Sequence, residues 1–125
     1  MNAPKHNPGF LALVDDAKSR IRQIDMAEYQ RMTAAREPHL LIDVREDGEW
    51  AAGHALGALH LGKGVIERDI ETKVPDKDTK LVLYCGGGFR SALAADALRQ
   101  MGYKHAISLA GGWRAYQSSG LPVER

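Results

Sequence analysis

The one cysteine of the chain, Cys85, stands where its thiol could act as a nucleophile. It follows the apolar run Leu81 to Tyr84 and precedes the glycine triplet that ends at Gly88. Glycines lack a Cβ, so such a turn can direct several backbone N–H groups at the sulfur. A helix starting near Arg90 adds the positive end of its dipole, and the Arg90 side chain adds a full charge. Both features favour the reactive thiolate and predict a thiol pKa below the usual ~8.5.

Other interpretations of this loop fit the sequence less well. A lone cysteine is commonly a small buried hydrophobe, but a structural cysteine needs no glycine triplet after it. A phosphate-binding P-loop needs a lysine, which this loop lacks. A dinucleotide fingerprint expects an acidic residue about 20 positions on, and none occurs between Asp96 and Glu124. Cysteine phosphatases place five residues between cysteine and arginine, whereas four separate Cys85 from Arg90.

A second polar residue, Asp43, ends another apolar run, Leu40 to Ile42. Strands that are apolar on both faces are typical of parallel sheets covered on both sides. Further strands are expected at 21–24 and 106–109, alternating with helices at 26–35, 46–52, 65–73, 90–101 and 113–118. The fold class is therefore α/β, a mostly parallel central sheet with helices on both faces. Because parallel strands end on one edge, Asp43 and Cys85 should lie on the same rim, where ligands bind.

The N-terminal part of the chain has a different sequence pattern. Residues 1–9 carry prolines and polar residues and are expected to form a loose arm. An apolar stripe at helical spacing follows and predicts a short helix packed on the domain, through Phe10, Leu13, Val14, Ala17 and Ile21. We therefore divide the chain into an N-terminal arm and helix, 1–20, and one domain, 21–125.

Composition limits the function further. The chain has 125 residues, 44% of them hydrophobic and 26% charged, which suits one globular domain. A net charge of +1 without basic blocks argues against nucleic-acid binding. The apolar run Phe10 to Val14 is too short for a membrane span or a signal peptide, so we expect a cytoplasmic protein without membrane partners. A single cysteine and scattered histidines predict no disulfide and no metal site.

Several motifs in order resemble the single-domain rhodaneses, or rhodanese-like sulfurtransferases. The loop Cys85 to Ser91, CGGGFRS, resembles their C-x-x-G-x-R-[ST] active-site loop. Leu41 to Arg45, with the pairs Glu49-Trp50 and Gly53-His54 and the stretch Gly57 to Leu61, resembles their first signature. Leu109 to Trp113 and Gly120 to Val123 resemble their C-terminal end.

The resemblance implies a rhodanese-like domain that transfers a sulfane sulfur in two displacements and needs no cofactor. The Cys85 thiolate takes sulfur from thiosulfate or an organic persulfide or mercapto donor. An acceptor, cyanide or a thiol, with a sulfur-accepting protein as an alternative, then removes it. Arg90 would be catalytic by supporting the persulfide charge or holding an anionic donor. The loop residues that would bind the persulfide are Gly86, Gly87, Gly88, Phe89 and Ser91.

Asp43 and Arg45 are predicted to support the site. For Asp43, bonding to strand-end amides is an equal alternative. Arg45 is expected either to line the entrance or to be a solvated charge paired with Glu46 or Glu49. Rhodaneses that use thiosulfate often carry basic residues directly after the cysteine, whereas this chain carries Gly86 and Gly87.

Two other functions stay open at this point. A non-catalytic sulfur carrier or redox-sensing module would modify Cys85 without turnover. A cysteine phosphatase or arsenate reductase would share the architecture, although the loop is one residue short for it.

Overall fold

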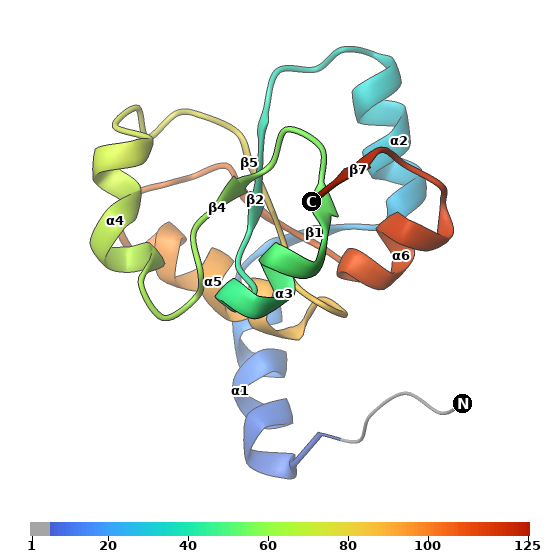
Figure 1. Ribbon diagram of the computed structural model, residues 1–125. Helices are drawn as coiled ribbons and strands as arrows, with labels where there is room; N and C mark the ends of the chain where they lie inside the picture. The colour runs from blue at the N-terminus through green and yellow to red at the C-terminus, as the bar shows by residue number, and fades with distance from the viewer. Residues whose placement is uncertain (1–5) are drawn as a thin grey trace.

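The computed structural model describes residues 6–125, so the predicted arm is described only from His6 onward and its first five residues lie outside. A five-stranded sheet with the order β1-β6-β5-β2-β4 forms the centre, and all its neighbouring strands are parallel (Figure 1). The strands are β1 (Arg22–Ile24), β2 (Leu40–Asp43), β4 (Leu59–His60), β5 (Leu81–Tyr84) and β6 (Ala106–Leu109). The predicted α/β class with a mostly parallel sheet is confirmed.

Helices cover both faces of this sheet (Figure 1). They are α1 (Pro8–Lys18), α2 (Met26–Ala34), α3 (Asp47–Ala52), α4 (Ile66–Lys73), α5 (Phe89–Gln100) and α6 (Gly112–Ser118). A separate antiparallel pair joins β3 (His54–Ala55) to β7 (Val123–Glu124). No helix of residues 6–125 is long and apolar enough to cross a membrane.

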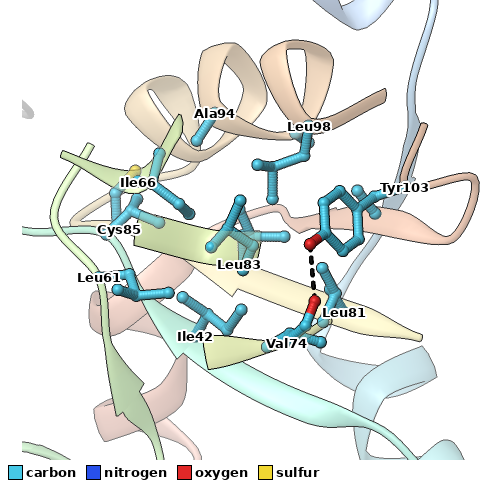
Figure 2. Packing of buried hydrophobic residues seen from close by; sticks show 14 residues of the cluster. Ile42, Leu61, Ile66, Val74, Leu81, Leu83, Cys85, Ala94, Leu98 and Tyr103 are labelled. Atoms are coloured by element: carbon cyan, nitrogen blue, oxygen red, sulfur yellow. Dashed lines mark hydrogen bonds between the residues drawn. The ribbon is translucent and has the colours of Figure 1, made fainter. Parts of the chain in front are cut away.

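Alternating residues of β5 supply two cores. Leu81, Leu83 and Cys85 pack on one face with α4 and α5 (Figure 2), and Val82 and Tyr84 pack on the other with α2 and α6. Every residue of β5 is buried, as expected for a central parallel strand. Burying each large aliphatic side chain contributes roughly 1.5–3 kcal/mol, so this strand is firmly placed and Cys85 at its end is too.

The N-terminal helix differs from the prediction at both ends. It begins at Pro8 rather than Phe10, because proline is well suited to the first helical position, where its missing N–H costs nothing. It packs on α5 through Val14 and Ala17, which are 0% and 2% exposed. The predicted stripe is wrong at Leu13, which is 62% exposed. Ile21 lies beyond the helix end.

Candidate active site

The sulfur of Cys85 lies at the carboxyl edge of the sheet, at the start of the loop between β5 and α5. Asp43 is paired in register with Tyr84, so the predicted shared rim of Asp43 and Cys85 is observed. Backbone N–H groups of Gly88 and Ser91 point at Cys85 Sγ from 3.2 and 3.4 Å. Cys85 itself is only 1% exposed, so these donors act on the sulfur with little competition from water.

A chain of hydroxyl groups continues from the sulfur into the protein. Ser91 Oγ lies 3.6 Å from Cys85 Sγ, and Ser108 Oγ lies 2.8 Å from Ser91 Oγ. Both serines are fully buried. Burial alone would raise the pKa of Cys85, but hydrogen bonds from the Ser91 side chain and from the Ser91, Gly88 and Gly87 amides outweigh it and lower the pKa below its ordinary value.

Each of the three loop glycines is needed at its position for a different physical reason. Of the three, Gly88 alone has a positive φ, 99°, the left-handed backbone that favours glycine. A Cβ on Gly86 would lie 3.3 Å from Arg90 Nη2, and one on Gly87 would lie 3.3 Å from Arg114 Nη1. Gly86 and Gly87 therefore let two guanidinium groups approach the loop backbone closely.

Two carbonyl groups of the loop accept hydrogen bonds from backbone N–H groups of α6. Trp113 N–H donates to the Cys85 carbonyl at 2.7 Å, and Arg114 N–H donates to the Gly86 carbonyl at 3.2 Å. Gly112 makes this contact possible, because a Cβ there would lie 2.3 Å from the Cys85 carbonyl oxygen. With the Gly86 carbonyl held by α6, the N–H of the next residue, Gly87, is directed toward the sulfur.

Arg90 is held by an acidic partner that the sequence prediction did not assign to it. Its Nη1 and Nη2 donate to the two Glu49 carboxylate oxygens at 2.8 and 3.1 Å. This contact lowers the pKa of Glu49 to about 2 and raises the pKa of Arg90, which the nearby Cys85 also favours. Arg90 therefore stays charged beside the sulfur, but much of its charge is balanced by Glu49.

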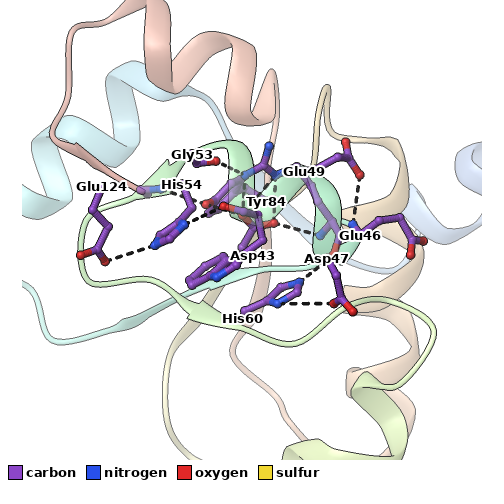
Figure 3. A network of polar contacts seen from close by, with 12 residues as sticks. Asp43, Glu46, Asp47, Glu49, Gly53, His54, His60, Tyr84 and Glu124 are labelled. Carbon is purple, nitrogen blue, oxygen red and sulfur yellow. Dashed lines mark hydrogen bonds and ion pairs between the residues drawn. The ribbon is translucent and has the colours of Figure 1, made fainter.

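Arg45 does not line the entrance and is not a solvated charge, so both expectations for it are wrong. It is 4% exposed and donates to both oxygens of Asp43, which is 0% exposed, at 2.7 to 3.1 Å. It also donates to the Gly53 carbonyl at 2.8 Å, and Tyr84 donates to Asp43 at 2.7 Å (Figure 3). A carboxylate two residues earlier in the chain was a nearer partner than Glu46 or Glu49.

The remaining signature residues form a scaffold around α3. Trp50 stacks on His54 and His60 at ring distances of 3.4 and 4.8 Å, and His60 bonds to the Arg45 carbonyl at 2.8 Å. Glu46 and Glu49 cap the first turn of α3 reciprocally (Figure 3). The scaffold thus fixes the helix turn that presents Glu49 to Arg90.

A cavity of about 310 Å³ reaches Cys85 and the loop residues around it. Besides the loop, it is lined by His6 and Phe10 from the N-terminal segment and by Arg114 from α6. Phe89 is half-buried in this lining. Among residues 6–125, no three histidine, cysteine, aspartate or glutamate side chains gather in a way that could hold a metal ion.

Four of these residues were not singled out by sequence reasoning. Ser108 could have been noticed as the polar residue of an otherwise apolar strand, Ala106–Leu109. Glu49 was named as part of a motif and as a possible partner of Arg45, but not as the partner of Arg90. Arg114 and His6 carry no local signal, because only the folded chain brings them to the loop.

The fold and this cysteine loop define a rhodanese-like protein, and comparison with known proteins agrees. The family model of the Rhodanese-like domain matches residues 25–119. A sulfurtransferase of Allochromatium vinosum is 35% identical over 103 residues, covering 82% of this chain and 94% of its own. The thiosulfate sulfurtransferase PspE of Escherichia coli is 37% identical over 71 residues, 57% of this chain and 67% of its own. The chain belongs to the rhodanese-like domain family.

A solved structure resembles almost the entire chain, including the N-terminal helix region. It is a Rhodopseudomonas palustris protein of unknown function, described as a possible tyrosine phosphatase. It superposes with a TM-score of 0.82 at 30% identity, and the match covers 98% of this chain and 100% of that one.

Proposed function

We propose that this protein is a sulfurtransferase that carries a sulfane sulfur as a persulfide on Cys85. The observation that carries the proposal is the sulfur itself: it is buried, faced by the Gly88 and Ser91 amides, and has a lowered pKa. The sulfurtransferases among its relatives support the same activity.

In the first displacement, the Cys85 thiolate attacks the outer sulfur of the donor. A bond forms between Sγ and that sulfur while the S–S bond of the donor breaks, and sulfite or a thiolate leaves with the electron pair. The product is the anion Cys85–S–S⁻. The inward N–H groups of the loop and the adjacent Arg90 stabilise this negative charge.

In the second displacement, an acceptor nucleophile attacks the outer sulfur of the persulfide. The bond from Sγ to the outer sulfur breaks, and the Cys85 thiolate is regenerated. Cyanide would leave as thiocyanate and a thiolate as a new persulfide, and the second route also allows a thiol on an acceptor protein. Every electron pair is accounted for, so neither step needs a cofactor.

The test is the intact mass of the reduced protein after exposure to thiosulfate or to an organic persulfide. We expect a gain of one sulfur atom that disappears when cyanide or a thiol is added. The Cys85→Ser variant, checked for folding by circular dichroism, should gain none. A wild-type protein that gains no sulfur, or gains it without passing it on, would overturn the proposal. Hydrolysis of an aryl phosphate that depends on Cys85 would instead indicate a phosphatase.

A further inference from the structure

The N-terminal helix reaches the active-site cavity from outside the residues that define the family. The family model starts at residue 25, whereas α1 spans Pro8–Lys18. Its buried residues, Val14 and Ala17, belong to neither core of the domain. The start of α1 nevertheless places Phe10, and His6 just before it, in the lining of the cavity over Cys85.

These side chains form an aromatic cluster with the loop residue Phe89. The His6 and Phe89 ring centroids are 4.4 Å apart, those of Phe10 and Phe89 are 6.2 Å apart, and those of His6 and Phe10 are 5.3 Å apart. Lys18 Nζ lies 5.0 Å from the Phe89 ring centroid. Rings at such distances make a continuous aromatic wall.

The anchorage of α1 shows that this wall is held in place. Arg20, just after the helix, donates to both carboxylate oxygens of Asp96 on α5 at 3.1 and 2.8 Å. Together with the packing of Val14 and Ala17 on α5, this fixes the axis of α1 relative to the loop.

The cavity also has a cationic side, provided by Arg114. Its guanidinium lies over Gly87, where an added Cβ would approach Nη1, Nη2 and Cζ to between 3.3 and 3.5 Å. Arg90 shares its charge with Glu49 in an ion pair, whereas no carboxylate within residues 6–125 forms an ion pair with Arg114. Among the described residues that line the cavity, Arg114 therefore supplies a positive charge without a carboxylate partner.

We propose that α1 is part of the substrate site, and that the cavity takes an organic sulfur donor whose aromatic or apolar group packs on His6, Phe10 and Phe89 while its anionic group meets Arg114. This inference rests on the proposed sulfurtransferase activity and names its substrate class. A volume of about 310 Å³ is at the lower end of small-molecule sites and exceeds what the small thiosulfate dianion needs.

Benzenethiosulfonate and thiosulfate form a matched pair of probes, because an aromatic ring in one replaces an oxyanion in the other. In both cases the Cys85 thiolate takes the outer sulfur, the S–S bond breaks, and benzenesulfinate or sulfite leaves with the electron pair. We expect Phe10→Ala to raise KM for benzenethiosulfonate by roughly three- to ten-fold at unchanged kcat, and to raise KM for thiosulfate by a clearly smaller factor. Phe10→Tyr should retain the wild-type KM.

Leu13→Ala, an exposed position on the same helix, is the matched control and should change neither donor. Arg114→Gln should raise KM for both anions by roughly ten-fold, with the loss fading at high salt, whereas Arg31→Gln on α2 should not. Equal effects of Phe10→Ala on the two donors, or no effect, would overturn this inference and leave the sulfurtransferase proposal standing. A wild-type protein that loads sulfur from neither donor would overturn both.

Discussion

Glu49 binds Arg90 with two parallel hydrogen bonds that link the α3 scaffold to the cysteine loop. Such bidentate pairs fix the guanidinium plane as well as its charge. The arginine beside the sulfur therefore acts as a positioned group of the loop, with less capacity to bind a donor than its sequence position indicates.

Breaking this link should affect activity more than stability. In Glu49→Gln the guanidinium of Arg90 loses its charged partner and is free to leave the loop. We expect sulfur loading of Cys85 to slow by about ten-fold. The Glu49 side chain is 39% exposed, so the unfolding free energy should fall by no more than ~1 kcal/mol. Stopped-time mass spectrometry and urea unfolding would measure the two effects. Glu67→Gln, an exposed change on α4, is the control, and a loss of stability without slower loading would contradict the assignment.

The pH dependence of Cys85 should reflect its hydrogen bonds. Because the folded protein lowers the pKa of this acid, the thiolate persists below the usual ~8.5 and is lost only as the pH falls through the lowered value. The rate of alkylation by iodoacetamide, followed by intact mass, should therefore have its midpoint below pH ~8.5. Glu49, with a pKa of about 2, adds no second break in the neutral range. A midpoint at or above that of a free thiol would contradict this.

The hydroxyl chain behind the sulfur should tune the same midpoint. Ser91→Ala removes a side-chain donor to the thiolate and should raise the alkylation midpoint by roughly 0.5 to 1 pH unit. Ser108→Ala, which acts only through Ser91 Oγ, should shift it less in the same direction. The exposed Ser118→Ala is the control. If Ser108→Ala shifted the midpoint more than Ser91→Ala, the inferred order of the hydroxyl groups, from Ser108 through Ser91 to the sulfur, would be wrong.

The buried pair of Asp43 and Arg45 should matter mainly for stability. Asp43→Asn leaves the Arg45 guanidinium buried without its carboxylate, which costs about 3–5 kcal/mol of unfolding free energy. Urea unfolding monitored by Trp50 and Trp113 fluorescence would measure it. Asp78→Asn, at an exposed site, should change stability by less than ~0.5 kcal/mol. A small loss of unfolding free energy in Asp43→Asn would contradict the stabilising role inferred for this pair.

Gly112 should tolerate no side chain. Its φ is 49° and an added Cβ would meet the Cys85 carbonyl, so Gly112→Ala must push α6 away from the loop. We expect a loss of at least about 2 kcal/mol together with lost sulfur loading. Gly48→Ala on α3, where nothing lies within 4 Å of the new Cβ, should be neutral or slightly stabilising. Calorimetry of the two variants would compare their Tm values. Equal values would contradict the predicted clash between a Cβ at position 112 and the Cys85 carbonyl.

Much of the fold was accessible from the sequence because β2 and β5 are buried on both faces and read as uninterrupted apolar runs. The same runs placed Asp43 and Cys85 on one rim. The two-residue strands β3, β4 and β7 were not predicted, because two residues are too few for a periodic pattern.

Only part of the site could be predicted from the sequence. Cys85 and its loop carry a local signal, since the glycines and the helix start are contiguous with the sulfur. The partners of Arg45 and Arg90 depend instead on side-chain directions, which spacing does not supply. Phe10 was assigned to a packing stripe, and only the placement of α1 across α5 reveals that its ring borders the cavity.

The strand order also dictates when the protein can assemble. β1 pairs with β6, Arg22 opposite Ile107, and α1 packs on α5, so the first elements made have partners that arrive near the end of the chain. Such non-local pairing slows folding, because loop closure must precede any gain from contacts. Until α5 emerges, the wall from α1 has no support, and until α6 emerges, the carbonyl of Cys85 has no amide to hold it. A nascent chain therefore carries Cys85 without these supports until α6 has been made.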